Sequence, residues 1–210
     1  MKMIQRNSIL LVLFCLGQHL VAQDSLLSKP AAFQSFSDSI VKDRHLVHKT
    51  NLAVLTAWSG VNILQGSISA TNAKGVDKAF FQMNAYWNVV NLGLATYGWI
   101  RLRQDTQKEW TLAQNTKAQH QVEKLLLLNT GLDLAYLSTG LYLKERGNRL
   151  NNPQTEGFGN SLLLQGTFLL VFDLVQYQRH RRNGKALENK MGEWQLVPAG
   201  MGLGLVYNFR

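Results

Sequence analysis

Amides recur at helical spacing within an otherwise apolar stretch, Phe81-Gln82-Met83-Asn84-Ala85-Tyr86-Trp87-Asn88-Val89-Val90-Asn91-Leu92. Asn84, Asn88 and Asn91 follow one another at steps of four and three residues, which places them on one face of a helix. The other faces are largely apolar. A helix with one polar face and a lipid-compatible back is typical of a bundle inside a membrane, where polar side chains hold the helices together.

Three other stretches share this character, and each has about the length of a membrane-spanning helix. They are residues 50–70, 125–143 and 158–178, which join residues 79–100 to make four. Charged residues collect between the stretches, at 101–124, 144–156 and 179–190. Because every backbone group in lipid must find a partner within its own helix, this pattern predicts an all-α fold: a four-helix transmembrane bundle made of two helical hairpins.

Six amide and acid residues fall within the four expected helices, where antiparallel packing would bring them toward one layer. They are Asn62, Asn88, Asn91, Asp133, Gln165 and Asp173. An ionisable group at mid-membrane is costly to bury, which makes Asp133 a candidate proton or cation site with amide oxygens as co-ligands. The alternative is a structural layer, in which interhelical hydrogen bonds of ~0.6 kcal/mol or somewhat more fix the register of the helices.

The first 22 residues have the features of a secretory signal peptide. Lys2 and Arg6 precede a short apolar core, and small Ala22 suits cleavage directly after it. The single cysteine, Cys15, lies in that core, so we expect a mature chain without disulfides or a cysteine-bound metal. The expected divisions are a signal peptide (1–22), an N-terminal extramembrane segment (23–49), a four-helix membrane domain (50–180), and a basic linker with a C-terminal β-hairpin (181–210).

Composition and charge fit this picture but leave the orientation open. Of the 210 residues, 46% are hydrophobic and 17% charged, with a net charge of +9 and a mean hydropathy of −0.11. Fifteen Lys and Arg fall on the side of the N-terminus, central connection and C-terminus, against five on the other side. The positive-inside rule puts the first side in the cytoplasm, whereas a cleaved signal peptide puts the mature N-terminus outside it. Three resolutions stay open: the chain has no cleaved signal peptide, or the positive side faces the periplasm, or the bundle is exported without insertion.

Histidines gather at one expected end of the bundle, and three are weak candidates for ligating a metal or haem: His48, His120 and His180. No His-x-x-x-His or Glu-x-x-His pair accompanies them, so we expect no metal and no cofactor. A basic cluster at 179–185 fits contact with anionic lipid headgroups or a solvated flank. No catalytic triad, phosphate loop or dinucleotide fingerprint occurs, and the aromatic residues are not interleaved with basic ones. We therefore expect a non-enzymatic protein that does not bind nucleic acid.

The end of the chain changes to a period-two pattern that predicts a strand. Its larger side chains are Met201, Leu203, Leu205, Tyr207 and Phe209. Residues 194–197 are its expected partner, across a turn at 198–200. Elsewhere, matches such as Asn62 with Asp133, 71 residues later, leave open a duplication of one helical hairpin.

The run 81–92 resembles the signature of an uncharacterised family of small bacterial membrane proteins of Bacteroidota type, classed as a domain of unknown function. Trp58 and Asn62, residues 129–136 and the Gly-rich end after Pro198 are similar too. The resemblance implies a four-helix membrane fold and carries no activity.

We expect an integral membrane protein of the bacterial cell envelope, in the inner rather than the outer membrane, with a structural or interaction role. Its expected partners are the lipid bilayer and either a second copy of the chain or another envelope protein. The alternative is a small proton- or ion-linked transporter or channel that uses the polar layer.

Overall fold

The computed structural model describes residues 31–192, 194–199 and 202–207. The signal peptide expected over 1–22, with its cleavage site at Ala22, lies outside them. The chain divides into two compact units, Met1–Phe36 and Ser37–Arg210. In the first unit only residues 31–36 are described, and they are helical. The second unit holds the bundle.

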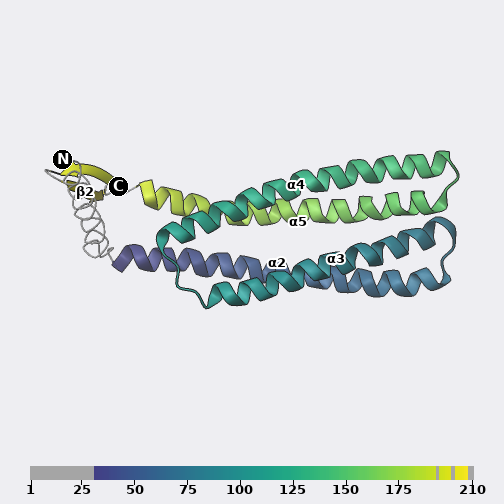
Figure 1. Ribbon diagram of the computed structural model, residues 1–210, viewed down its shortest axis with the longest axis horizontal. Helices are drawn as coiled ribbons and strands as arrows, with labels where there is room; N and C mark the ends of the chain where they lie inside the picture. The colour runs from purple at the N-terminus through teal and green to yellow at the C-terminus, as the bar shows by residue number, and fades with distance from the viewer. Residues whose placement is uncertain (1–30, 193, 200–201, 208–210) are drawn as a thin grey trace, which may run out of the picture. The chain divides into compact units, whose positions relative to one another are not determined.

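Four helices account for nearly all of residues 31–192 and pair as two hairpins (Figure 1). They are α2 (Ala31–Asn72), α3 (Gly75–Thr106), α4 (Leu112–Arg149) and α5 (Pro153–Gly192). The expected all-α arrangement of four helices is thus confirmed over these residues.

The connections are short, and each has a local cause. Gly75 opens α3 with φ 56°, a left-handed conformation that glycine adopts without strain, and Asn151 has φ 50° in the turn between α4 and α5. At the start of α4 the Thr111 hydroxyl accepts from the Gln114 backbone N–H at 3.3 Å, while the Gln114 side chain accepts from the Thr111 N–H at 3.2 Å. This capping box ends the connection from α3 and starts α4.

The helices are longer than expected. The expected helix ends, placed where charged residues begin, are therefore corrected. Residues 101–106 extend α3, residues 112–124 open α4, and residues 181–192, expected as a basic linker, continue α5. With a rise of ~1.5 Å per residue, the 40 residues of α5 measure about 60 Å, twice the ~30 Å hydrocarbon core of a bilayer. We call residues 37–49, 112–124 and 179–192 of α2, α4 and α5 the helical extension.

Glycines set the close approach of α5 to its neighbours. A Cβ on Gly159 would lie 2.7 Å from the Gly140 carbonyl oxygen of α4, and one on Gly147 would lie 2.6 Å from the Glu156 Cα. On the side of α3, a Cβ on Gly157 would lie 2.6 Å from the Ala79 Cβ. Small residues at such crossings let backbones pack closely where side-chain burial gives little drive.

The bundle has a polar interior and an apolar surface. Asn88, Gln165 and Ser59 are fully buried at 0% exposure, whereas Val61, Leu64 and Ile68 are 62–67% exposed. The buried hydrophobic residues of the described part are few, and three of the seven are alanines: Ile40, Ala79, Ala85, Ala95, Leu126, Leu162 and Leu187. This is the reverse of a water-soluble bundle, in which large apolar side chains fill the core.

The C-terminal segment holds two antiparallel strands, β1 (Trp194–Ala199) and β2 (Gly202–Tyr207). Trp194 pairs with Tyr207, and Pro198 pairs with Leu203. The turn expected at 198–200 is therefore wrong in position, because β1 continues through Ala199.

Candidate functional site: the polar interior

All six residues of the expected polar layer are buried. The least exposed are Asn88 and Gln165 at 0%, and the most exposed is Asp173 at 6%. The remaining three are Asn62, Asn91 and Asp133. The structure divides them between a closed hydrogen-bond network and an open cavity.

The closed network ties α2, α3 and α5 together around Asn84. The Asn84 amide donates to the Asn62 side-chain oxygen at 2.6 Å. The Asn84 side-chain oxygen accepts in turn from the Gln165 amide and, at 3.4 Å, from the Ser161 hydroxyl. The Trp58 indole donates to Gln165 at 3.0 Å. Asn84 is thus the centre of the network, although it is not one of the six residues expected in the polar layer. Its helical spacing with Asn88 and Asn91 is the sequence feature that could have predicted this place.

Asn88 and Asn91 are bonded mainly along α3. Asn88 donates to the Asn84 carbonyl at 2.8 Å, and Asn91 donates to the Asn88 side-chain oxygen at 3.4 Å. These hydrogen bonds give the buried amides partners within α3, so they stabilise the polar face of α3 and do not join it to another helix.

The bundle also contains a cavity of about 570 Å³, which is lined by side chains from all four helices. Its polar lining side chains are His48, Asn51, Asn91, Asn129, Asp133, Asp173 and Gln176. Trp87 and Tyr136 also line it, with ring centroids 4.9 Å apart in an edge-to-face arrangement. Three of the six expected residues, Asn91, Asp133 and Asp173, therefore line a cavity and do not belong to the closed network.

The two acids are hydrogen-bond partners of each other, and Asp173 also bonds the Asn129 side chain. Asp173 accepts from Gln176 at 3.4 Å, and Gln176 accepts from Asn51 at 2.7 Å. The second carboxyl oxygen of Asp133, Oδ2, is buried without a hydrogen-bond partner. Two carboxyl groups therefore face the same cavity, and one of them has a buried oxygen without a hydrogen-bond partner.

Two of the three candidate histidines meet next to the cavity. The rings of His48 and His180 have centroids 4.8 Å apart, and both ring nitrogens of His180 are buried without partners. Burial, with the nearby charge of Arg44, lowers the pKa of His48 to about 4 and that of His180 to about 3. Both rings are therefore neutral at physiological pH.

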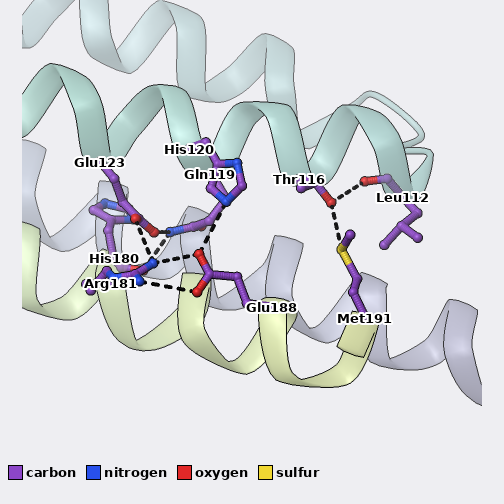
Figure 2. Close-up of polar contacts among 9 residues, drawn as sticks. All are labelled: Leu112, Thr116, Gln119, His120, Glu123, His180, Arg181, Glu188 and Met191. Carbon is purple, nitrogen blue, oxygen red and sulfur yellow. Dashed lines mark hydrogen bonds and ion pairs between the residues drawn. The ribbon is translucent and has the colours of Figure 1, made fainter. Parts of the chain in front are cut away.

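His120 lies apart from that pair, in a polar network between α4 and α5 (Figure 2). Its Nε2 is 3.5 Å from Glu188, which forms two hydrogen bonds with Arg181, at 2.8 and 3.2 Å. Arg181 also reaches the buried Glu123 at 3.3 Å. Among the described residues no group of three His, Cys, Asp or Glu side chains is placed to hold a metal ion.

The helical extension has its own buried polar core, which sequence reasoning missed. Arg44 is 2% exposed and donates a hydrogen bond to the Asn115 side chain. Its guanidinium carbon lies 4.6 Å from the centre of the Trp110 ring, a cation–π contact. Burial lowers the pKa of Arg44 to about 10 against the opposing charge of Asp105. Gln119 donates to the His180 carbonyl at 2.6 Å. The four-residue steps from Asn115 to Gln119 to Glu123 were the available signal.

These observations define a class: a four-helix bundle with buried amides and acids, glycine-mediated crossings and an apolar exterior. Within that class, the family described as "Family of unknown function (DUF6992)" matches residues 54–174, and the chain belongs to it. The match covers most of the bundle, including the closed network and the acidic pair. No curated protein and no solved structure matches the chain.

Proposed function

We propose that this chain is an integral membrane protein of the bacterial cell envelope whose helices cross the bilayer as one bundle. The inversion of polarity carries the proposal. Exposed apolar side chains form a belt along all four helices, as with Val61, Val90, Leu128 and Val171, each 58–62% exposed. Lipid accepts such a surface at no cost, whereas water would drive it to aggregate.

The length of the belt supports this placement. On α3 the exposed apolar residues run from Tyr86 to Ile100, and on α4 from Leu125 to Tyr142. With ~1.5 Å per residue these stretches measure roughly 20–25 Å along the helix axes, near the ~30 Å hydrocarbon thickness. The helical extension then lies beyond the bilayer surface.

Helix length and hydropathy identify fewer membrane-spanning helices than the four that we expected. Over the described residues one helix, Pro153–Gly192, is long and apolar enough to cross a membrane. The other three fall below that measure because their inward faces carry amides and acids, which lower the mean hydropathy of the whole helix. Averaging over all faces hides an apolar outer face.

Membrane insertion is tested by single cysteines in the mature chain, which we expect to be otherwise cysteine-free. Val61→Cys, on the apolar belt, should resist a charged maleimide and react with a membrane-soluble one, while Lys117→Cys should react with both. The wild-type chain should stay with membranes through an alkaline carbonate wash. Release by that wash, together with full labelling of Val61→Cys by the charged reagent, would refute the proposal. Phosphatase fusions at Lys74 and Lys117 would then give the orientation: activity at one position alone fits a spanning bundle.

Within the membrane, the closed network supports a structural or interaction role, in which interhelical hydrogen bonds hold the bundle in one register. The cavity supports the second candidate, a proton or ion site. The specific observation is Asp133, which is 3% exposed and has an unpartnered oxygen in a cavity shared by four helices. Asp133→Asn keeps the shape of the side chain; if proton or cation flux in proteoliposomes is the same for both proteins, the charge has no part in the function.

A further inference from the structure

The walls of the cavity are chiefly apolar. All four helices contribute apolar side chains, among them Leu55, Val90, Leu126 and Phe172. Its volume of about 570 Å³ falls within the roughly 300–1,000 Å³ of sites that hold small organic ligands. A bare inorganic ion would contact little of this apolar surface. The size and apolar lining of the cavity therefore favour an organic ligand.

The cavity reaches the lipid-facing surface between α3 and α4. No Cα atom of α3 comes within 8 Å of one in α4. The lining residues that are also strongly exposed come from these two helices: Val90 and Leu94 at 61%, Leu125 at 57% and Leu132 at 45%. The lining residues of α2 and α5 are buried or half-buried. A ligand dissolved in the bilayer would thus enter sideways, between α3 and α4.

The acids that line the cavity, Asp133 and Asp173, have no basic partner among the described lining residues. No Lys or Arg stands among its lining residues, and the one lining base, His48, is neutral because burial holds its pKa at about 4. Asp133 and Asp173 both line the cavity, and the Oδ2 atom of Asp133 is buried without a hydrogen-bond partner. A cation would pair with these carboxyl groups, and the aromatic rings of Trp87 and Tyr136 line the same cavity.

We propose that this cavity binds a lipophilic organic cation, an amine or quaternary ammonium with an apolar body, which enters from the bilayer between α3 and α4. The proposal rests on the membrane placement argued above. The cationic head lies at the Asp133–Asp173 pair, and the apolar body lies against the leucines of the four helices. The ligand class follows from two features together: an apolar wall too large for a bare ion, and two carboxyl groups with no Lys or Arg among the described lining residues.

The test uses detergent-purified full-length protein and two probes of the same shape. Phenethyltrimethylammonium carries a permanent positive charge, and its carbon isostere, (3,3-dimethylbutyl)benzene, carries none. Titration calorimetry should show saturable binding of the cation and at least about tenfold weaker binding of the isostere. Asp133→Asn and Asp173→Asn should each weaken binding of the cation by a similar factor. Asp77→Asn, which changes an exposed acid of α3, should leave the affinity for the cation unchanged.

The route of entry has a matched pair of variants. Val90 lines the cavity and Val89 beside it does not, although the two are 61% and 58% exposed. In lipid nanodiscs Val90→Trp should slow association of the cation at least about fivefold, and Val89→Trp should not. Equal rates for the two variants would overturn lateral entry.

Equal affinity for cation and isostere would show a neutral, lipid-like ligand and overturn the proposal, as would absence of saturable binding in folded protein. Retained binding in both Asp→Asn variants would overturn the role of the acidic pair. Circular dichroism of each variant shows whether it is folded. Because binding is measured on purified protein, failure here is distinct from failure of the carbonate and cysteine experiments, which test membrane insertion.

Discussion

The side-chain amide of Asn84 donates to the side-chain oxygen of Asn62 at 2.6 Å, joining α3 to α2 inside the bundle. Both residues are buried, at 2% and 4% exposure, so the bond forms where side chains find few other partners. Gln165 and Ser161 of α5 bond the oxygen of the same Asn84 amide. One side chain therefore connects three helices.

Replacing Asn84 by Ala should destabilise the bundle by roughly 1–3 kcal/mol, because the Asn62 and Gln165 amides lose a buried partner. Val89→Ala, at an exposed position of the same helix, should change stability by less than ~0.5 kcal/mol. Unfolding of the detergent-purified variants in increasing dodecyl sulfate measures both. An Asn84→Ala variant as stable as Val89→Ala would show that the network contributes nothing to the fold.

Two glycines on the same bundle should respond in opposite ways to alanine. A Cβ at Gly159 would meet the Gly140 carbonyl oxygen at 2.7 Å and the Lys144 backbone nitrogen closer still, whereas at Gly93 nothing lies within 4 Å. Gly159→Ala should force α4 and α5 apart and lower stability by roughly 2 kcal/mol or more. Gly93→Ala should be neutral or stabilising by up to ~1 kcal/mol, because alanine favours a helix. Similar midpoints for the two variants would contradict the close α4–α5 crossing.

Stability should fall as the pH drops from about 6.5 toward 4. The pKa values of His48 and His180 are lowered by burial to about 4 and about 3, so the unfolded chain takes up protons in this window while the folded chain does not. Each histidine then costs up to ~1.4 kcal/mol of stability per pH unit, and its contribution is fully present above its unfolded pKa of ~6.5.

The His48→Gln, His180→Gln double variant should show a flatter thermal-stability profile between pH 7.5 and pH 5 than the wild type. Parallel profiles for the double variant and the wild type would show that the buried pair does not set the pH dependence.

The polar network of the helical extension should be asymmetric in its response to mutation. Arg181→Gln leaves the buried Glu123 with Gln119 as its remaining bonded side chain, while Glu188→Gln removes a charge that is 43% exposed. We expect the unfolding midpoint to fall more for Arg181→Gln, and the difference to narrow at high salt because exposed charges are screened. A larger loss in Glu188→Gln would place the important contact at the surface.

Much of the interior was predictable from residue spacing. Asn84, Asn88 and Asn91 recur at steps of four and three, and a straight helix turns such residues to one face whatever surrounds it. The same argument placed Asn62, Asp133 and Gln165 inward, where the structure has them. Charge alone does not show the ends of the helices, because most charged side chains of 112–124 and 179–190 lie on the outer face of continuing helices, while Glu123 is buried.

The sequence by itself determined which residues face inward and that four helices form, since both depend on local periodicity and on segment length. Only the tertiary structure decided how the polar layer divides, with Asn62, Asn84 and Gln165 in a closed network while Asp133 and Asp173 share a cavity. That division depends on how close the backbones come. Gly157 and Gly159 bring α5 against α3 and α4, whereas α3 and α4 stay apart from each other, and no periodicity within one helix records the distance to another.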